Sequence, residues 1–272
     1  MTSPSSPGRI QDKVALVTGV GYPRGIGMLT ARRLAQEGAR VMVTDILDSV
    51  HARAAELQAE GLPALAFQAD LTDRPQVETL AAETAAQYGR IDILVNVAGK
   101  SVPPRPPFLE MSDDYWNMVL DRNLKTTYLC CKVVLPYMAA QRYGKVVNIS
   151  SFTGVKYAYR YSAAYAASKG AVSGLTKALA LEMGEYNINV NAVLPGDIWV
   201  NDQEWTPAEG RRDLGVHDPF LSPPITRPGR PEEIADAVLF LVSEEARFIA
   251  GLDLLVDGGA SIVEPTTAPP TK

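Results

Sequence analysis

Lys13-Val-Ala-Leu-Val-Thr18 runs directly into Gly19-Val-Gly-Tyr-Pro-Arg-Gly25-Ile-Gly27, and an amphipathic stretch, 28–37, follows. The first six residues are a nearly continuous apolar run, which is typical of a strand buried on both faces of a parallel sheet. The glycines allow the backbone to approach a ligand closely, and the first turn of the following helix offers unpaired N–H groups and the positive end of its dipole. A glycine loop alone could be a tight turn. Between a strand and a helix, it predicts a phosphate-binding site.

The next strand, 39–45, ends in Asp45, about twenty residues beyond the glycine loop. A carboxylate at this place can accept hydrogen bonds from an adenosine ribose and repels the 2′-phosphate of NADP. Asp45 could instead cap the helix expected over 46–60, and Arg24 could pair with a phosphate. We expect NAD as the cofactor, with NADP less favoured.

Strands and helices continue to alternate along the chain. Further strands are expected at 64–70, 91–96, 144–151, 188–194 and 252–256, separated by helical stretches that include 112–138 and 231–242. This alternation predicts an α/β fold, a Rossmann-type doubly wound parallel sheet in a single domain. Ligands of such sheets bind beyond the carboxyl ends of the strands. The residues expected at that edge are Gly19, Asp45, Asp70, Asn96 and Ser151.

Tyr165 and Lys169 are four residues apart in a helical stretch and therefore share one face of the helix. A neighbouring ammonium group stabilises a phenolate, so we expect the pKa of Tyr165 to be lowered. Tyr-x-x-x-Lys occurs often by chance, but here a buried strand ending in Ser150 and Ser151 precedes it. A strand that delivers a serine beside a helix that delivers tyrosine and lysine is a candidate active site.

The composition narrows the possible functions. The chain has 272 residues, is 46% hydrophobic and carries a net charge of −5, which argues against a nucleic-acid or anionic-membrane surface. Adjacent Cys130 and Cys131 are expected to pack as small apolar groups, and with two histidines the chain favours neither a disulfide framework nor a metal site. With no signal peptide and no membrane span apparent, we expect a cytoplasmic protein. Residues 1–11 and 264–272 are expected to be disordered tails around a domain over 12–260.

Together these motifs resemble the short-chain dehydrogenase/reductase family in its compact single-domain form. The resemblance covers about Asp12 to Gly259 and implies that Asn123, Ser151, Tyr165 and Lys169 form the catalytic tetrad. Asn123 alone would suggest only a solvated helix position. The cofactor contacts expected on this basis are Gly19, Arg24, Gly25, Ile26, Gly27, Asp45, Ile46, Asp70, Leu71, Asn96, Ala98, Gly99, Tyr165, Lys169, Pro195, Gly196 and Ile198.

The chain departs from the family pattern at three places. Five residues rather than three separate Gly19 from Gly25, so 22–24 should bulge near the adenosine phosphates. Val97 replaces an asparagine, and Val200 stands where a threonine often helps to bind nicotinamide.

The resemblance implies reversible hydride transfer between a secondary alcohol or ketone and nicotinamide, with Tyr165 as general acid and base, and a homotetramer. The loop 197–228 would select the substrate, and its aromatic residues suggest an apolar or cyclic small molecule. A 3-oxoacyl thioester reductase using NADPH is the nearest alternative, and a catalytically silent NAD-binding sensor is a remote one. An enoyl reductase would need a tyrosine seven residues before Lys169, where Ser162 stands.

Overall fold

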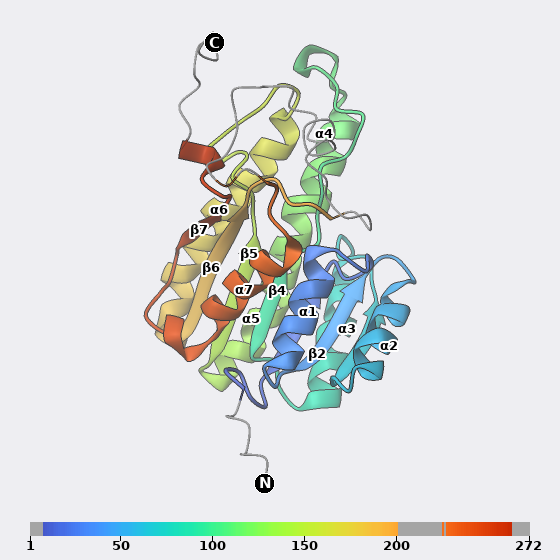
Figure 1. The fold of residues 1–272 in the computed structure, drawn as a ribbon, viewed down its shortest axis with the longest axis vertical. Coiled ribbons are helices and arrows are strands. Elements are labelled where there is room, and N and C mark those ends of the chain that lie inside the picture. The colour runs from blue at the N-terminus through green and yellow to red at the C-terminus, as the bar shows by residue number, and fades with distance from the viewer. Residues whose placement is uncertain (1–7, 201–224, 226, 263–272) are drawn as a thin grey trace.

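The computed structural model describes residues 8–200, 225 and 227–262, and its centre is one sheet of parallel strands (Figure 1). The strands are hydrogen-bonded in the order β3-β2-β1-β4-β5-β6-β7. Because the order reverses beside β1, where the chain crosses from β3 to β4, the sheet is doubly wound. This confirms the predicted Rossmann-type α/β fold. The strands are β1 Val14–Thr18, β2 Arg40–Asp45, β3 Ala64–Gln68, β4 Ile93–Asn96, β5 Gly144–Ile149, β6 Ile188–Pro195 and β7 Asp253–Val256.

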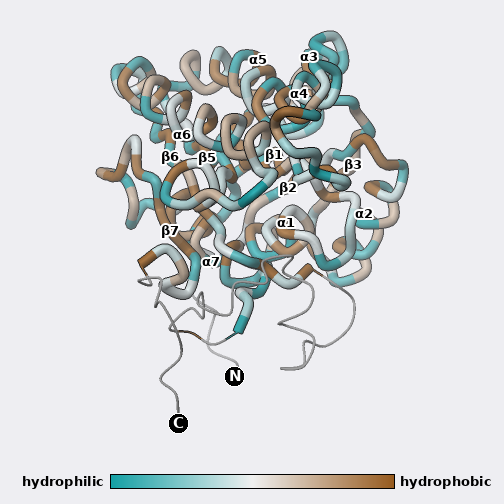
Figure 2. The backbone as a smooth tube through the Cα atoms, turned by 90° about the horizontal axis from the view of Figure 1, so that it is seen from above, coloured by the Kyte–Doolittle hydropathy of each residue, from teal (hydrophilic) through white to brown (hydrophobic). Residues whose placement is uncertain are grey.

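Each face of the sheet has its own hydrophobic core, because successive side chains of a strand point to opposite faces. Ala15 and Val17 pack into one core and Leu16 into the other. One core is covered by α1 (Ile26–Gln36), α2 (Val50–Ala59) and α7 (Pro231–Val242). The other is covered by α3 (Arg74–Tyr88), α5 (Thr126–Gln141) and α6 (Ala163–Met183). Figure 2 shows the sheet between these two helical layers.

Two predicted helices differ from those observed. The stretch 112–138 is not one regular helix: α4 (Asp113–Leu120) passes into a π-helical turn, Asp121–Lys125, before α5 begins. A π-turn adds one residue to the hydrogen-bonded ring, and hydrophobic periodicity gives no sign of it. The helix expected from residue 46 begins only at Val50, because Asp45 and the residues after it are tied into a turn. Short 3₁₀ turns lie at Phe108–Glu110, Gly184–Tyr186, Glu244–Ala246 and Ala260–Ile262.

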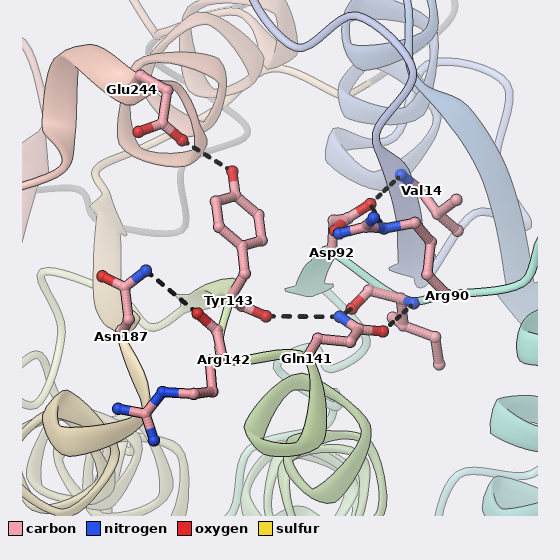
Figure 3. Close-up of polar contacts among 9 residues, drawn as sticks. Val14, Arg90, Asp92, Gln141, Arg142, Tyr143, Asn187 and Glu244 are labelled. Carbon is pink, nitrogen blue, oxygen red and sulfur yellow. Dashed lines mark hydrogen bonds and ion pairs between the residues drawn. The ribbon is translucent and has the colours of Figure 1, made fainter.

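The amino-terminal edge of the sheet is held together by side chains that bond to backbone groups (Figure 3). Asp92 is fully buried. It accepts a hydrogen bond from the Val14 N–H at 2.9 Å and forms an ion pair with Arg90 at 2.6 Å. Gln141 bonds both the N–H and the C=O of Ile91. These contacts join β1, β4 and the end of α5 at the edge opposite to the candidate site.

Residues 8–11 pack against the domain, although the sequence places them in the N-terminal tail. Ile10 is buried, and its N–H donates to the Glu37 C=O at 3.2 Å. The rest of the predicted tail, the tail 264–272 and most of the loop 197–228 lie outside the described residues.

Cys130 and Cys131 are buried free thiols in α5, which confirms their packing role. Burial raises the pKa of both thiols. Among the described helices, none has the length and apolar character needed to cross a membrane.

Candidate functional site

The glycine loop lies between the carboxyl end of β1 and the first turn of α1. Gly19 has a φ of +73°, and a Cβ there would come within 2.9 Å of the Ala98 nitrogen. A Cβ on Gly27 would lie 2.3 Å from the Gly19 carbonyl oxygen, so the loop and the helix approach at a distance that only glycine permits. Gly25 is the N-cap of α1; no side chain caps this terminus and no acidic residue lies in the first turn. Its N–H groups thus remain available to a phosphate.

The glycine loop is hydrogen-bonded through Gly21 to the end of β2 and the residues after it. Asp45 Oδ2 accepts a hydrogen bond from the Gly21 N–H at 2.8 Å, and Ser49 Oγ donates to the Gly21 carbonyl at 2.8 Å. Asp45 Oδ1 accepts from the Leu47 N–H, so Asp45 closes the loop rather than capping α2, whose N-cap is Ser49. Tyr22 and Arg24 are exposed beyond this clasp. The Lys100 ammonium lies 5.8 Å from the centre of the Tyr22 ring.

Asp70 lies at the end of β3 and bonds mainly within its own turn. Its Oδ1 accepts from the Thr72 N–H at 2.9 Å and the Thr72 hydroxyl at 2.7 Å. Leu71 beside it is buried, whereas Ile46 after β2 is 59% exposed. An apolar surface is therefore present next to Asp45, as an adenine ring would need.

Thr18 fixes the turn that follows β4, a role that the sequence analysis missed. Its hydroxyl oxygen accepts from the Val97 N–H at 2.9 Å and the Ala98 N–H at 3.0 Å. The Asn96 side chain does not face the glycine loop, because its amide donates to Asn148 Oδ1 on β5 at 2.8 Å. Only the backbone after Asn96, through Ala98 and Gly99, faces the predicted cofactor position.

Asn123 lies in the π-helical turn and is fully buried, so the simple interpretation as a solvated helix position is wrong. Its amide nitrogen donates to the carbonyl oxygens of Lys100 at 3.1 Å and Val119 at 2.9 Å. Its Oδ1 has no hydrogen-bond partner in the described part of the chain. A Cβ on Gly99 would lie 2.7 Å from this oxygen. A buried acceptor without a partner is the group expected to hold a water molecule.

Ser150 and Ser151 have different roles at the end of β5. The Ser150 hydroxyl donates to the Lys169 carbonyl at 2.8 Å and ties the strand to α6. Ser151 Oγ accepts from the Thr153 N–H at 3.1 Å, and the Ser151 side chain acts on Tyr165, whose pKa it lowers. The structure therefore brings Ser151, not Ser150, to the phenol.

Tyr165 and Lys169 lie one turn apart on α6, as their spacing predicts. The Lys169 ammonium is buried; it donates to the Ile149 carbonyl at 2.8 Å and lies 5.9 Å from the centre of the Tyr165 ring. Burial lowers the pKa of Lys169 to about 8. Burial also raises the pKa of Tyr165 to about 12, against the smaller opposing effect of Ser151. The predicted lowering of the Tyr165 pKa is thus wrong for this structure, because desolvation of the phenolate outweighs its stabilising contacts.

The turn after β6 is held against the C-terminal strand. The Gly196 N–H donates to the Val256 carbonyl at 3.0 Å, and a Cβ on Gly196 would lie 2.8 Å from Asp257. Ile198 is bridged to Gly229, with Trp199 N–H bonding the Gly229 carbonyl at 2.9 Å. Pro195, Gly196 and Ile198 are in this way fixed next to the end of β5, and Val200 is exposed after them.

These positions fit a dinucleotide with nicotinamide beside Tyr165. The uncapped helix terminus would hold the pyrophosphate, Asp45 the adenosine ribose and Lys169 the nicotinamide ribose. The fit rests on the close glycine contacts of the loop and on the donors and acceptors placed along one edge of the sheet. Sequence reasoning missed Thr18. A hydroxyl before the first glycine was the available signal for it.

Comparison with known proteins places the chain in one family. A family model described as enoyl-(acyl carrier protein) reductase matches residues 19–261. The chain is 39% identical to the 3-oxoacyl-[acyl-carrier-protein] reductase FabG of Thermotoga maritima, over 93% of this chain and all of the relative. It is 36% identical to cis-4-hydroxycyclohexanecarboxylate dehydrogenase of Sinomonas cyclohexanicum, over 93% of this chain and 98% of the relative.

A solved structure agrees with these relatives. The crystal structure of a putative short-chain dehydrogenase/reductase from Burkholderia xenovorans matches with a TM-score of 0.84 and 36% identity, over 94% of this chain and 98% of that one. The sheet order, the glycine loop and these matches lead to one conclusion: the chain belongs to the short-chain dehydrogenase/reductase family of nicotinamide-dependent oxidoreductases.

Proposed function

We propose that the protein is an NAD-dependent dehydrogenase that interconverts a secondary alcohol and its ketone. The observation that carries the proposal is the placement of Tyr165 one helical turn from the buried Lys169, with Ser151 acting on the same phenol, at the sheet edge that also carries the glycine loop. When bound there, the nicotinamide would supply the hydride chemistry. The other steps fall to side chains of this chain.

Tyr165 is the proposed general acid and base. With a pKa of about 12 it keeps its proton at neutral pH, so the phenol as it stands can donate that proton to a ketone oxygen. Ser151 would hold the same oxygen through its hydroxyl. The free Oδ1 of Asn123 would accept a hydrogen bond from a water molecule on the route by which Tyr165 exchanges its proton with solvent.

Asp45 supports NAD as the preferred cofactor. Its carboxylate stands at the end of β2, where a 2′-phosphate would meet a like charge. Arg24 is exposed and is the group that would favour NADP. The loop donates its hydrogen bond to Asp45 from Gly21 and not from Arg24.

The proposed substrate is an apolar or cyclic secondary alcohol. The relative named for a hydroxycyclohexane substrate supports a cyclic one. Reduction of a 3-oxoacyl thioester is the second candidate, supported by the 39% identity to FabG. Comparing NADH with NADPH on a short 3-oxoacyl thioester separates the two, since NADPH-specific turnover would favour the reductase.

The test follows NADH formation by its near-ultraviolet absorbance with a panel of secondary alcohols, sugars, cyclic diols and hydroxy acids. Tyr165→Phe should lower kcat/KM by about a thousandfold while NADH still binds, because only the transferable proton is lost. Tyr161→Phe is the matched control: Tyr161 is 52% exposed and lies four residues before Tyr165, ahead of α6. Substantial activity in Tyr165→Phe would refute the catalytic assignment. NADH binding without turnover across the panel would favour the sensor alternative.

We further propose that the protein forms a homotetramer through the helices that carry Asn123 and Tyr165. Apolar side chains exposed on this side support the proposal: Tyr128 on α5 is 42% exposed and Leu181 on α6 is 85% exposed. Lone apolar side chains are common on surfaces, but two on adjacent helices suit an interface.

A further inference from the structure

Arg105 lies in a proline-rich connection between β4 and α4 that borders the candidate site. Pro103, Pro104, Pro106 and Pro107 surround it, and each fixes its own φ, which reduces the number of conformations open to the segment. The segment is also tied down ahead of Arg105. The Lys100 carbonyl accepts from Asn123, and the Val102 carbonyl accepts from the Tyr115 hydroxyl at 2.6 Å. The backbone near Arg105 is therefore anchored to the π-helical turn and to α4.

The guanidinium of Arg105 lies over the ring of Tyr159, 5.0 Å from its centre. Tyr159 is itself positioned just before α6: the Ser162 hydroxyl donates to the Tyr159 carbonyl at 2.6 Å, and Ser162 is the N-cap of the helix that carries Tyr165. A guanidinium placed over an aromatic face is held by the ring while its N–H groups can still bond in its own plane. The contact therefore orients the cation without using up its donors.

Arg105 and Tyr159 both interact electrostatically with Tyr165 and change its pKa. The positive charge of Arg105 lowers the pKa of Tyr165, and Tyr159 raises it, each less than burial does. Arg105 is exposed and forms no ion pair with any carboxylate of residues 8–200, 225 and 227–262. The segment that leads into α6, the helix of the reactive phenol, thus holds a preorganised cation with planar donors and, in the described part of the chain, no acidic partner.

We propose that Arg105 binds a carboxylate of the substrate, so that the substrate is a secondary hydroxy acid or the corresponding oxo acid whose oxygen lies between Ser151 and Tyr165. The planar fork of a guanidinium matches the two oxygens of a carboxylate and bonds them in parallel. This inference rests on the proposed dehydrogenase function and assigns the substrate class to the same site. Arg105 is then a specificity-determining residue that touches the part of the substrate remote from the reaction.

The test titrates cyclohexanecarboxylate and, separately, its neutral isostere cyclohexanecarboxamide into the NADH-saturated protein by calorimetry. The carboxylate should bind to the wild type about tenfold more tightly than the carboxamide. Arg105→Gln should remove that difference, and Arg105→Lys should restore only part of it, since an ammonium keeps the charge but not the fork. Arg160→Gln is the matched control, because Arg160 is an exposed arginine next to Tyr159 whose charge is not among those acting on Tyr165.

A kinetic measurement separates binding from folding. With 4-hydroxycyclohexanecarboxylate as substrate, Arg105→Gln should raise KM about tenfold with a smaller effect on kcat, whereas Arg160→Gln should leave KM as in the wild type. No carboxylate binding to the NADH complex, equal binding of acid and amide, or no effect of Arg105→Gln would overturn the inference. Failure of NADH itself to bind would instead refute the proposed function, so the two failures are distinguishable.

Discussion

Lys169 is the buried cation of the site. Burying its charged ammonium group lowers the stability of the folded protein. Its pKa is about 8 in the folded chain and 10.5 as the ordinary value. Between these two pH values the unfolded chain holds a proton that the folded chain has released. The free energy of unfolding therefore rises with pH over that window.

We predict that this rise disappears when Lys169 is replaced by methionine. In urea titrations between pH 8 and 10, the wild type should gain roughly 2 kcal/mol of unfolding free energy relative to Lys169→Met. Below pH 8 both states of the wild type are protonated, so the difference between the proteins should be constant. The range stops at pH 10 because the raised pKa of Tyr165 acts in the opposite direction above it. A difference that stays flat from pH 8 to 10 would contradict the prediction.

Asp45 is the residue on which the proposed preference for NAD over NADP depends. Asp45→Asn removes the charge that would repel a 2′-phosphate and keeps an acceptor for the Gly21 N–H. The preference for NAD over NADP, measured as the ratio of kcat/KM values, should fall by about tenfold or more. Asp48→Asn, an exposed carboxylate of the same connection, should leave the ratio unchanged. An unchanged ratio in Asp45→Asn would mean that Asp45 does not select the cofactor.

At the scale of elements, the buried Asp92 joins β1 to β4 at the edge away from the site. Asp92→Asn should lower the free energy of unfolding by about 2 kcal/mol, since the amide loses the charge that pairs with Arg90 and its NH2 group cannot accept from Arg90 as the second carboxylate oxygen does. Chemical denaturation at pH 7 measures the change. The control is Asp12→Asn, at the exposed residue before β1, whose φ of +63° asparagine tolerates. An equal loss in both variants would show that the contacts of Asp92 do not stabilise the fold more than those of an exposed aspartate.

Secondary structure was predictable from the sequence where burial sets the pattern. The strands follow from apolar runs such as Val14–Thr18, and α7 was predicted with the bounds observed, Pro231–Val242. The π-helical turn was not predictable, because one extra residue in a helical ring leaves the surrounding polarity unchanged. In the candidate site, the placement of Tyr165 and Lys169 one turn apart on a helix was predictable from their spacing. The pKa of Tyr165 was not, because it depends on desolvation by segments far away in the sequence.

Arg105 illustrates the same limit at the site. Neither the prolines around it nor the irregular segment of Tyr159 has a period that would place them together. Their contact depends on how two connections pack at the edge of the sheet. Such information appears only in three dimensions.

At the scale of the whole molecule, the proposed tetramer makes a prediction about mass. Light scattering should give about four times the chain mass of 29.4 kDa. Replacing Tyr128 and Leu181 together by lysine should reduce the measured mass, since charged side chains would be buried in the interface. His51→Lys, on α2 in the other helical layer, should not. A monomer mass for the wild type would refute the proposed assembly.

The hydrogen bonds that join Gly21 to Asp45 and Ser49 limit how the cofactor preference of this protein can change, by design or in evolution. The carboxylate proposed to choose the cofactor also holds the lengthened glycine loop closed, and a Cβ on Gly21 would come within 2.9 Å of it. Cofactor preference and loop shape therefore share one residue, so a switch to NADP through a residue with no side-chain acceptor would need a new acceptor for the Gly21 N–H. Variants that change Asp45 alone to a small apolar residue should open the loop, and a historical change of cofactor in this lineage would carry compensating changes near Gly21 and Ser49.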